Sequence, residues 1–227
     1  MSDVWTDEEL KASVEAYVEM QRNERAGQLI VKQHYYRKLA EQFGRTEKAF
    51  EGRMQNISYV LSLMGRSWLT GLKPARNIDK IAAAQIERLL DHLQGQKAAP
   101  IAAFEIAVRE RTQQKTLPKP RGNPRPKSRR IAIPHFYRDA TVKAWVLQQA
   151  EGICESCEKP APFKTADGLP YLELHYLRQL AEGGTDTVSN AVALCPNCHR
   201  EIHHGANAQA LEAWLYDNVE RLTQDEF

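Results

Sequence analysis

The sequence lacks the features that mark secreted and membrane proteins. No apolar run approaches the ~20 residues that cross a bilayer. The first ten residues are acidic and polar, which is unlike a secretory signal. Hydrophobic residues make up 42% and charged residues 26% of the 227, as in an ordinary globular chain. We therefore expect a cytoplasmic protein of one large or two small domains, with no membrane partner.

Cysteine is absent from the first 153 residues. The four cysteines that follow form two Cys-x-x-Cys pairs, Cys154 with Cys157 and Cys195 with Cys198. In a chain without an export signal, this paired spacing indicates zinc rather than disulfide bonds. The sequence therefore predicts one structural Zn²⁺ held by all four cysteines.

Acidic residues are unevenly spread, and none lies between Glu110 and Asp139. Residues 1–150 contain 26 Lys and Arg against 16 Asp and Glu, a net charge of +10, whereas residues 151–227 contain 5 against 13, a net charge of −8. A basic front half suggests a polyanionic partner, and ordinary solvated charge is the alternative. An acidic back half fits a site that binds metal cations.

Hydrophobic spacing predicts helices throughout the first half of the chain. The expected ranges are 6–21, 32–43, a third helix from the cap Thr46 to Leu63, 78–94 and 100–114. Thr6 and Glu9 have the spacing of a capping box. The short turn between the second and third helices resembles a helix-turn-helix. We expect this domain, residues 1–115, to bind duplex DNA through residues on or near the third helix: Arg45, Lys48, Arg53 and Asn56. A basic three-helix bundle without DNA contact is the alternative.

Residues 116–136 are predicted to be a basic, proline-rich linker. Proline makes such a segment extended and semi-rigid. A basic extended segment can follow a phosphate backbone or enter a minor groove, and a solvated tether is the equal alternative. If the linker contacts DNA, the residues expected to do so are Arg121, Arg125, Lys127, Arg129 and Arg130.

Three histidines in the last third of the chain are spaced to share one metal ion. Residues 172–176 alternate in the manner of a strand, which places His175 on one strand face. Pro196 suits the first turn of a helix, and His199 and His203, four residues apart, then share one helical face. A strand histidine packed on two helix histidines would leave open metal positions, as catalytic sites require. His204 lies round the helix from His203.

These motifs resemble the HNH nuclease domain of McrA-type, modification-dependent restriction endonucleases. The resemblance covers about the last third of the chain. It is carried by residues Ala144–Gln149, Gly152–Cys157, Ala161–Phe163, Leu169–His175, Gly183-Gly184, Asp186-Thr187 and Ala193–His203. It implies an α+β, mostly helical protein in which residues 137–227 form a ββα-metal HNH domain with a four-cysteine zinc, behind the N-terminal helical domain.

The resemblance also implies roles for single residues. His175, His199 and His203 match the ligands of a catalytic divalent ion (Mg²⁺, Mn²⁺, Ni²⁺ or Zn²⁺), and the four cysteines match the zinc knuckles. Asn190 matches the residue that orients the general base. The base itself is a histidine in the family, whereas this chain has Tyr176.

A phenol with a pKa near ~10 does not accept a proton at neutral pH, and loss of a general base costs about 10²–10⁴ in rate. Three explanations stay open: a version inactivated to tolerate a toxic nuclease, a naturally degenerate domain, or a shifted base such as His204. We favour inactivation of an otherwise ordinary active site.

The expected function is that of a type IV restriction enzyme. It would hydrolyse phosphodiester bonds in duplex DNA that carries modified cytosine, as a homodimer because two strands need two active sites. The alternatives are a non-catalytic DNA reader with a zinc-stapled scaffold, and an HNH nuclease without modification dependence.

Overall fold

The computed structural model describes residues 5–94, 101–120 and 137–223. The chain divides into two compact units, residues 1–134 and 135–227. The five linker residues predicted to contact DNA, Arg121, Arg125, Lys127, Arg129 and Arg130, lie outside the described residues. The helices in the described part of the chain are all too short or too polar to span a lipid bilayer.

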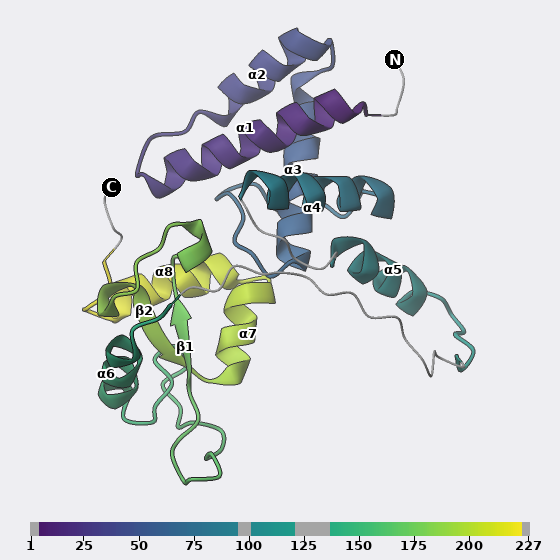
Figure 1. Cartoon of the computed structure of the whole chain (residues 1–227). Coiled ribbons are helices and arrows are strands. Elements are labelled where there is room, and N and C mark those ends of the chain that lie inside the picture. The colour runs from purple at the N-terminus through teal and green to yellow at the C-terminus, as the bar shows by residue number, and fades with distance from the viewer. Residues whose placement is uncertain (1–4, 95–100, 121–136, 224–227) are drawn as a thin grey trace. The chain divides into compact units, whose positions relative to one another are not determined.

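The described part of the N-terminal unit is helical, as the hydrophobic spacing predicts. Its helices are α1 (Asp7–Arg25), α2 (Lys32–Phe43), α3 (Glu47–Leu63), α4 (Lys80–Leu93) and α5 (Ala102–Thr112). α3 runs across both α1 and α4 and packs against each (Figure 1). The capping box is confirmed, because the Thr6 and Glu9 side chains each accept the other's backbone N–H. α1 continues four residues beyond the predicted end, to Arg25.

The core of this unit forms where α1 meets α3. Val14 and Tyr17 of α1 are buried against Phe50 and Ile57 of α3 in one hydrophobic cluster. The buried hydroxyl of Tyr17 lies 2.8 Å from Ser58 Oγ and accepts the backbone N–H of Leu69 at 2.9 Å. A tyrosine can therefore be fully buried here, because its polar end is paired.

Helix α5 receives its N-terminal cap from a neighbouring helix. Its own N-cap residue, Ile101, has no side chain that can accept a hydrogen bond. Glu87 of α4, only 2% exposed, accepts the backbone N–H groups of Ile101 at 2.7 Å and Ala102 at 2.9 Å. The carboxylate thereby satisfies donors that a helix start leaves unpaired.

The C-terminal unit is built on a two-stranded antiparallel sheet. Strand β1 (Glu173–Tyr176) pairs with β2 (Ala191–Leu194) in a register that sets His175 opposite Val192. Both strands lie between α6 (Ala140–Ala150) and α7 (Pro196–His204) in Figure 1, and both helices pack on them. The short 3-10 helices η1 (Leu180–Glu182) and η2 (Val188–Asn190) lie between the strands in sequence, and α8 (Ala208–Asn218) follows α7. Two strands followed by a helix confirm the expected α+β class and the ββα order.

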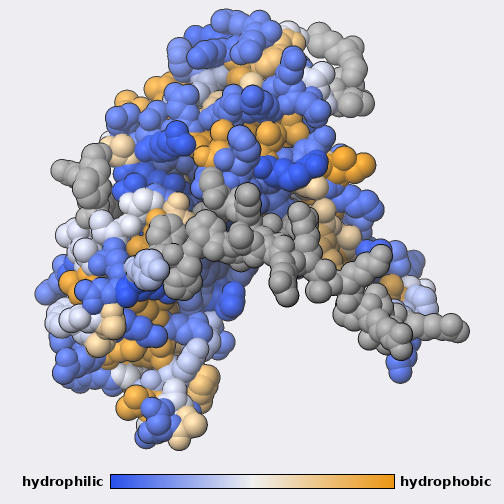
Figure 2. All heavy atoms as spheres, in the orientation of Figure 1, coloured by the Kyte–Doolittle hydropathy of each residue, from blue (hydrophilic) through white to orange (hydrophobic). Residues whose placement is uncertain are grey.

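Hydrophilic residues dominate the face that Figure 2 shows, and the hydrophobic residues visible there are interrupted by them. The apolar side chains are instead gathered inside two separate clusters, one in each unit. Each unit therefore has a core of its own, as a domain requires.

A buried ion pair fastens the turn before α3 to the start of α1. Glu9 accepts hydrogen bonds from Arg45 Nε at 2.5 Å and Arg45 Nη2 at 3.0 Å. The guanidinium of Arg45 also lies 4.6 Å from the centre of the Trp5 ring, and that of Arg53 lies 4.3 Å from it. Hydrogen bonding to Arg45 holds the pKa of Glu9 below its ordinary value, against the effect of burial.

We predict that Glu9→Gln destabilises the N-terminal unit by about 1–3 kcal/mol, because a charge-assisted pair becomes a weaker neutral one. The folded-state pKa of Glu9 is lowered, so its stabilisation is present at neutral pH and is lost as the pH falls through that pKa. The protection factors of amides in α1 and α3, which are corrected for the pH dependence of intrinsic hydrogen exchange, should therefore fall on acidification in the native chain more than in the variant. Glu15→Gln, on the exposed side of α1, is the matched control and should change exchange little. Equal exchange in all three proteins would contradict the prediction.

Candidate functional site

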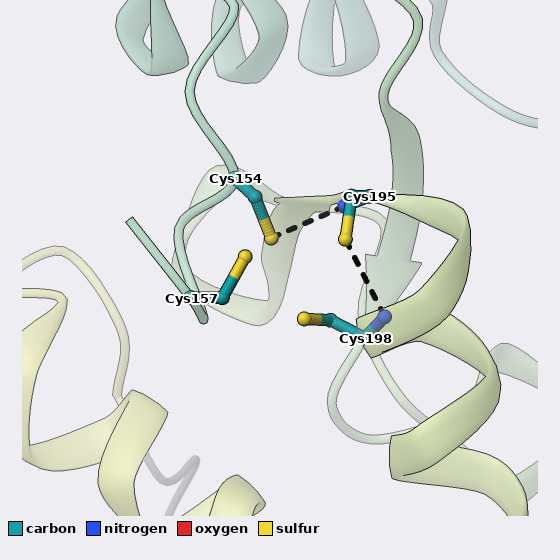
Figure 3. A group of neighbouring side chains, drawn as sticks. All are labelled: Cys154, Cys157, Cys195 and Cys198. Atoms are coloured by element: carbon teal, nitrogen blue, oxygen red, sulfur yellow. Dashed lines mark hydrogen bonds between the residues drawn. The ribbon is translucent and has the colours of Figure 1, made fainter. Parts of the chain in front are cut away.

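The four cysteines converge, as Figure 3 shows. Cys154 and Cys157 lie in the turn that follows α6, whereas Cys195 is the N-cap of α7 and Cys198 lies in its first turn. All four sulfurs lie within 4.8 Å of one another, and all four residues are free thiols. The predicted ligand set is therefore brought together from two separate chain segments.

The surroundings of the four sulfurs differ. Burial raises the pKa of the Cys157 thiol, and burial together with hydrogen bonding to Cys195 raises the pKa of the Cys198 thiol. Cys154 Sγ accepts the backbone N–H of Cys195 at 3.2 Å, and Cys195 Sγ accepts that of Cys198 at 3.5 Å. Burial alone would raise the pKa of the Cys154 thiol, but backbone N–H groups that point at its sulfur lower it below its ordinary value. Four convergent sulfurs with N–H donors fit a tetrahedral structural Zn²⁺.

A second ion pair, which the sequence did not reveal, braces this cluster. Glu155 lies between the first two cysteines, and its carboxylate accepts from Arg221 Nη1 at 2.6 Å and Nη2 at 2.7 Å. The same carboxylate accepts the backbone N–H of Ala193 in β2 at 2.6 Å, while Arg221 also donates to Ala191 O. The turn, the strand and the segment after α8 are thereby joined.

The three histidines converge as well. His175 extends from β1, and His199 and His203 from one face of α7, with ring centres 4.9–5.0 Å apart. The Nε2 atoms of His199 and His203 are 3.3 Å apart. Two nitrogens at about 2.0–2.1 Å from one tetrahedral metal ion would be separated by about 3.3 Å. The cluster therefore fits a single divalent ion, and its ligand atoms all lie within 4.8 Å of one another.

The electrostatics of the cluster keep its buried member neutral. Burial first, and then the charges of His203 and His199, lower the pKa of His175 to about 3. A neutral imidazole has the lone pair that a metal requires. Glu173, two residues before His175 on the same strand, lies 2.5 Å from His199 Nδ1. Glu173 was not among the residues predicted for the site, although the two-residue period of a strand places it on the His175 face.

Tyr176, at the position where the resemblance implies a general base, faces a different set of groups. Its hydroxyl donates to Asp186 Oδ1 at 2.7 Å, and Arg138 lies 5.6 Å from the centre of its ring. Burial and the hydrogen bond to Asp186 raise the pKa of Tyr176 to about 12. Tyr176 also borders a cleft of about 360 Å³ that Arg138, Lys143 and Tyr171 help to line. Asp186 is a functional candidate that sequence analysis cited only as part of a motif.

Asn190 does not hold residue 176 by its side chain. Its Oδ1 accepts the backbone N–H of Arg178 at 2.9 Å, and its Nδ2 donates to the carbonyls of Arg178 at 2.9 Å and Thr185 at 2.8 Å. Gly184 lies inside this loop, where a Cβ would be 2.0 Å from Arg178 O. These contacts correct the expectation that the Asn190 side chain holds residue 176. Asn190, which is 2% exposed, instead closes the loop between the strands.

The residues predicted to contact DNA in the N-terminal unit have different environments. Asn56 is 4% exposed, and its amide donates to Ala75 O and Asn77 Oδ1. Both amide donors of Asn56 are thus used inside the fold, which disfavours the predicted contact of Asn56 with DNA. Arg45 and Arg53 flank Trp5, whereas Lys48 is exposed on α3. His204, the alternative base, lies outside the histidine cluster.

Comparison with known proteins identifies the domain that holds both clusters. Residues 154–205 match the family model described as HNH endonuclease. A type IV methyl-directed restriction enzyme of Escherichia coli (strain K12), EcoKMcrA, is 52% identical over 108 residues, which are 48% of this chain and 39% of that protein. The match thus spans about two fifths of that curated relative.

A solved structure, the type IV phosphorothioation-dependent restriction endonuclease ScoMcrA, is also similar. It is 26% identical, and the match covers 66% of this chain and 24% of that chain. The TM-score of 0.35 is too low to support any argument about shared architecture.

We predict that removing the metal from the cysteine cluster unfolds the region around it, because metal binding supplies much of the folding free energy of small zinc modules. Chelation, or Cys157→Ala, should abolish hydrogen-exchange protection of β1, β2 and α7. Lys159→Ala, an exposed change just after the first cysteine pair, is the control and should retain the metal. A metal-free chain with a cooperative thermal transition for residues 151–205 would contradict the prediction.

Proposed function

We propose that this chain, which carries an HNH endonuclease domain, is a DNA endonuclease that hydrolyses phosphodiester bonds with one divalent ion. The observation that carries the proposal is the convergence of His175, His199 and His203 on one point. Three nitrogen ligands leave coordination positions open, as a catalytic site requires and a closed structural site does not. The separate four-cysteine cluster supplies the structural site, so the histidines are not needed for that purpose.

The side chains of the candidate site would have three separate roles, which are metal binding, phosphate binding and loop closure. His175, His199 and His203 would hold the ion, which would supply positive charge to stabilise the phosphorane and the leaving oxygen. His175 remains neutral at physiological pH because its pKa is lowered to about 3. Arg138 and Lys143 would contact phosphate from the neighbouring cleft, which Asp139 and Glu173 also line. Asn190 keeps the loop that carries Asp186 closed.

The substrate we propose is duplex DNA with a modified cytosine, cut by a homodimer of type IV restriction enzymes. The proposal is supported by the 52% identity to a relative whose name describes it as methyl-directed, and by the basic charge of residues 1–150. A nuclease without modification dependence is the alternative. Cleavage of matched duplexes with cytosine, 5-methylcytosine, 5-hydroxymethylcytosine or phosphorothioate separates the two.

Tyr176 favours a second candidate, a DNA-binding protein whose nuclease site is impaired. With a pKa of about 12, about one Tyr176 in 10⁵ is a phenolate at pH 7. Its hydroxyl is also engaged as a donor to Asp186. Tyr176 therefore cannot take a proton from water efficiently, and a general base is missing from an otherwise assembled site.

We predict that Tyr176→His raises metal-dependent DNA cleavage by about 10²–10⁴-fold, the usual contribution of a general base. The side chain of residue 176 faces Asp186 rather than the histidine cluster, so the affinity for the ion should stay nearly constant. Cleavage is measured with Mg²⁺, Mn²⁺ or Ni²⁺ in zinc-loaded protein. Tyr176→Phe keeps the ring without the hydroxyl and should cleave as poorly as the present sequence.

Two results would count against this account. If Tyr176→His cleaves no faster than Tyr176→Phe on any DNA that the protein binds, residue 176 does not limit activity. If the present sequence already cleaves at ordinary restriction-enzyme rates, the base is elsewhere. His204→Ala and Asp186→Asn would then be the variants to compare.

We also predict that the N-terminal unit binds duplex DNA through the exposed face of α3. Lys48→Glu should weaken binding and reduce the slope of log affinity against log salt by about 1–2, because one phosphate contact contributes about 0.9. Lys11→Glu, an exposed reversal on α1, is the matched control. Lys48 is preferred because Arg45 and Arg53 hold Trp5, and their loss would disturb the fold. Unchanged affinity and slope in Lys48→Glu would exclude this face.

A further inference from the structure

The carboxylate of Glu173 contacts His199 on the ring nitrogen other than the one that faces His203. Glu173 Oε2 lies 2.5 Å from His199 Nδ1, and Glu173 Oε1 accepts the hydroxyl of Tyr171 at 3.0 Å. We infer that Glu173 is a positioning residue that fixes the ring orientation and tautomer of His199 for metal binding, and that Tyr171 holds Glu173 in place. The inference rests on the metal site of the proposed function.

The hydrogen bond decides which nitrogen of His199 is available. An ionised carboxylate only accepts hydrogen bonds, so the proton of a neutral His199 must reside on Nδ1. The lone pair then lies on Nε2, the atom that is 3.3 Å from His203 Nε2. Without this partner, both tautomers of His199 would be populated, and one of them would present a proton to the metal.

The strand places the ligand and its support together. Glu173 and His175 are two residues apart on β1, so their side chains project from the same strand face. That face meets α7, and one strand thereby supplies a ligand and also orients a ligand on the helix. Glu173 itself does not belong to the group of ligand atoms that converge, which contains the three histidines alone among the described residues in this part of the unit.

The support extends to a stacked aromatic pair. The Tyr171 ring stacks on Phe163 with centres 4.7 Å apart and an angle of 17° between the planes. This stack restricts the Tyr171 ring, and its hydroxyl in turn restricts Glu173. Tyr171→Phe should therefore weaken metal binding less than loss of the Glu173 carboxylate does. The substitution removes the hydroxyl that holds Glu173, but it leaves the contact between Glu173 and His199 in place.

The first test measures Ni²⁺ affinity by calorimetry in the chain of residues 1–227 with zinc bound at the cysteine cluster alone. We expect Glu173→Ala to weaken binding by about 10–100-fold, the usual cost of losing a group that supports a metal ligand. Glu173→Gln should lose less, because its amide oxygen still accepts the Nδ1 proton, and Tyr171→Phe less again. Glu201→Ala removes the same charge from an exposed position on α7 and is the matched control.

The second test reads the tautomer directly. In the Ni²⁺-free, zinc-loaded chain, ¹⁵N spectra of the imidazoles should show His199 protonated on Nδ1. In Glu173→Ala, the Nε2-protonated form should appear, while the signals of His175 and His203 stay in place. The variant must keep its zinc and its amide spectrum, which shows that it is folded. In such a protein, loss of a residue that only stabilised the fold would leave the ratio of the two His199 tautomers unchanged.

The outcomes separate this inference from the proposed function. Equal Ni²⁺ affinity in the native chain and Glu173→Ala, or an unchanged His199 tautomer, would overturn the inference and leave the metal site intact. If His199→Ala binds Ni²⁺ as tightly as the native chain, the metal site is wrong and the inference fails with it. Neither test needs DNA cleavage, so the state of residue 176 does not affect them.

Discussion

The convergence of four cysteine sulfurs on one point is the constraint on which we expect the C-terminal unit to depend. Two strands of four residues each form a sheet too small to be stable alone. Cys195 and Cys198 fix the first turn of α7 to the turn after α6, and His199 and His203 follow on the same short helix. The positions of two candidate metal ligands are therefore tied to the cysteine cluster, one helical turn away.

Much of this arrangement can be predicted from spacing, because spacing acts over one turn or one strand. Capping residues, helix ranges, both Cys-x-x-Cys pairs and the histidines four residues apart are local patterns, and the structure places them as expected. Asn56 could not be judged in this way. Its helix position is suitable for DNA, but its amide is used by Ala75 and Asn77, about twenty residues away. Glu173 and Asp186 were missed because their partners are also distant in sequence.

The acidic charge of residues 151–227 is partly used inside the fold. Glu155 pairs with Arg221, Glu173 contacts His199, and Asp186 accepts from Tyr176 and from the backbone N–H of Asp139. Each of these carboxylates ties together segments far apart in the chain. The net charge of −8 thus overstates the negative field that a nucleic acid would meet, because several acids already have hydrogen-bond donors.

The cap that Glu87 provides for α5 has a consequence for the order of folding. An isolated helix of 11 residues is marginal in water, and α5 has no side-chain cap of its own. Its first backbone donors are satisfied only after α4 has presented Glu87 to them. α5 should therefore be a late element in the folding of the N-terminal unit. During synthesis α4 leaves the ribosome before α5, so Glu87 is available to cap α5 as soon as that helix forms.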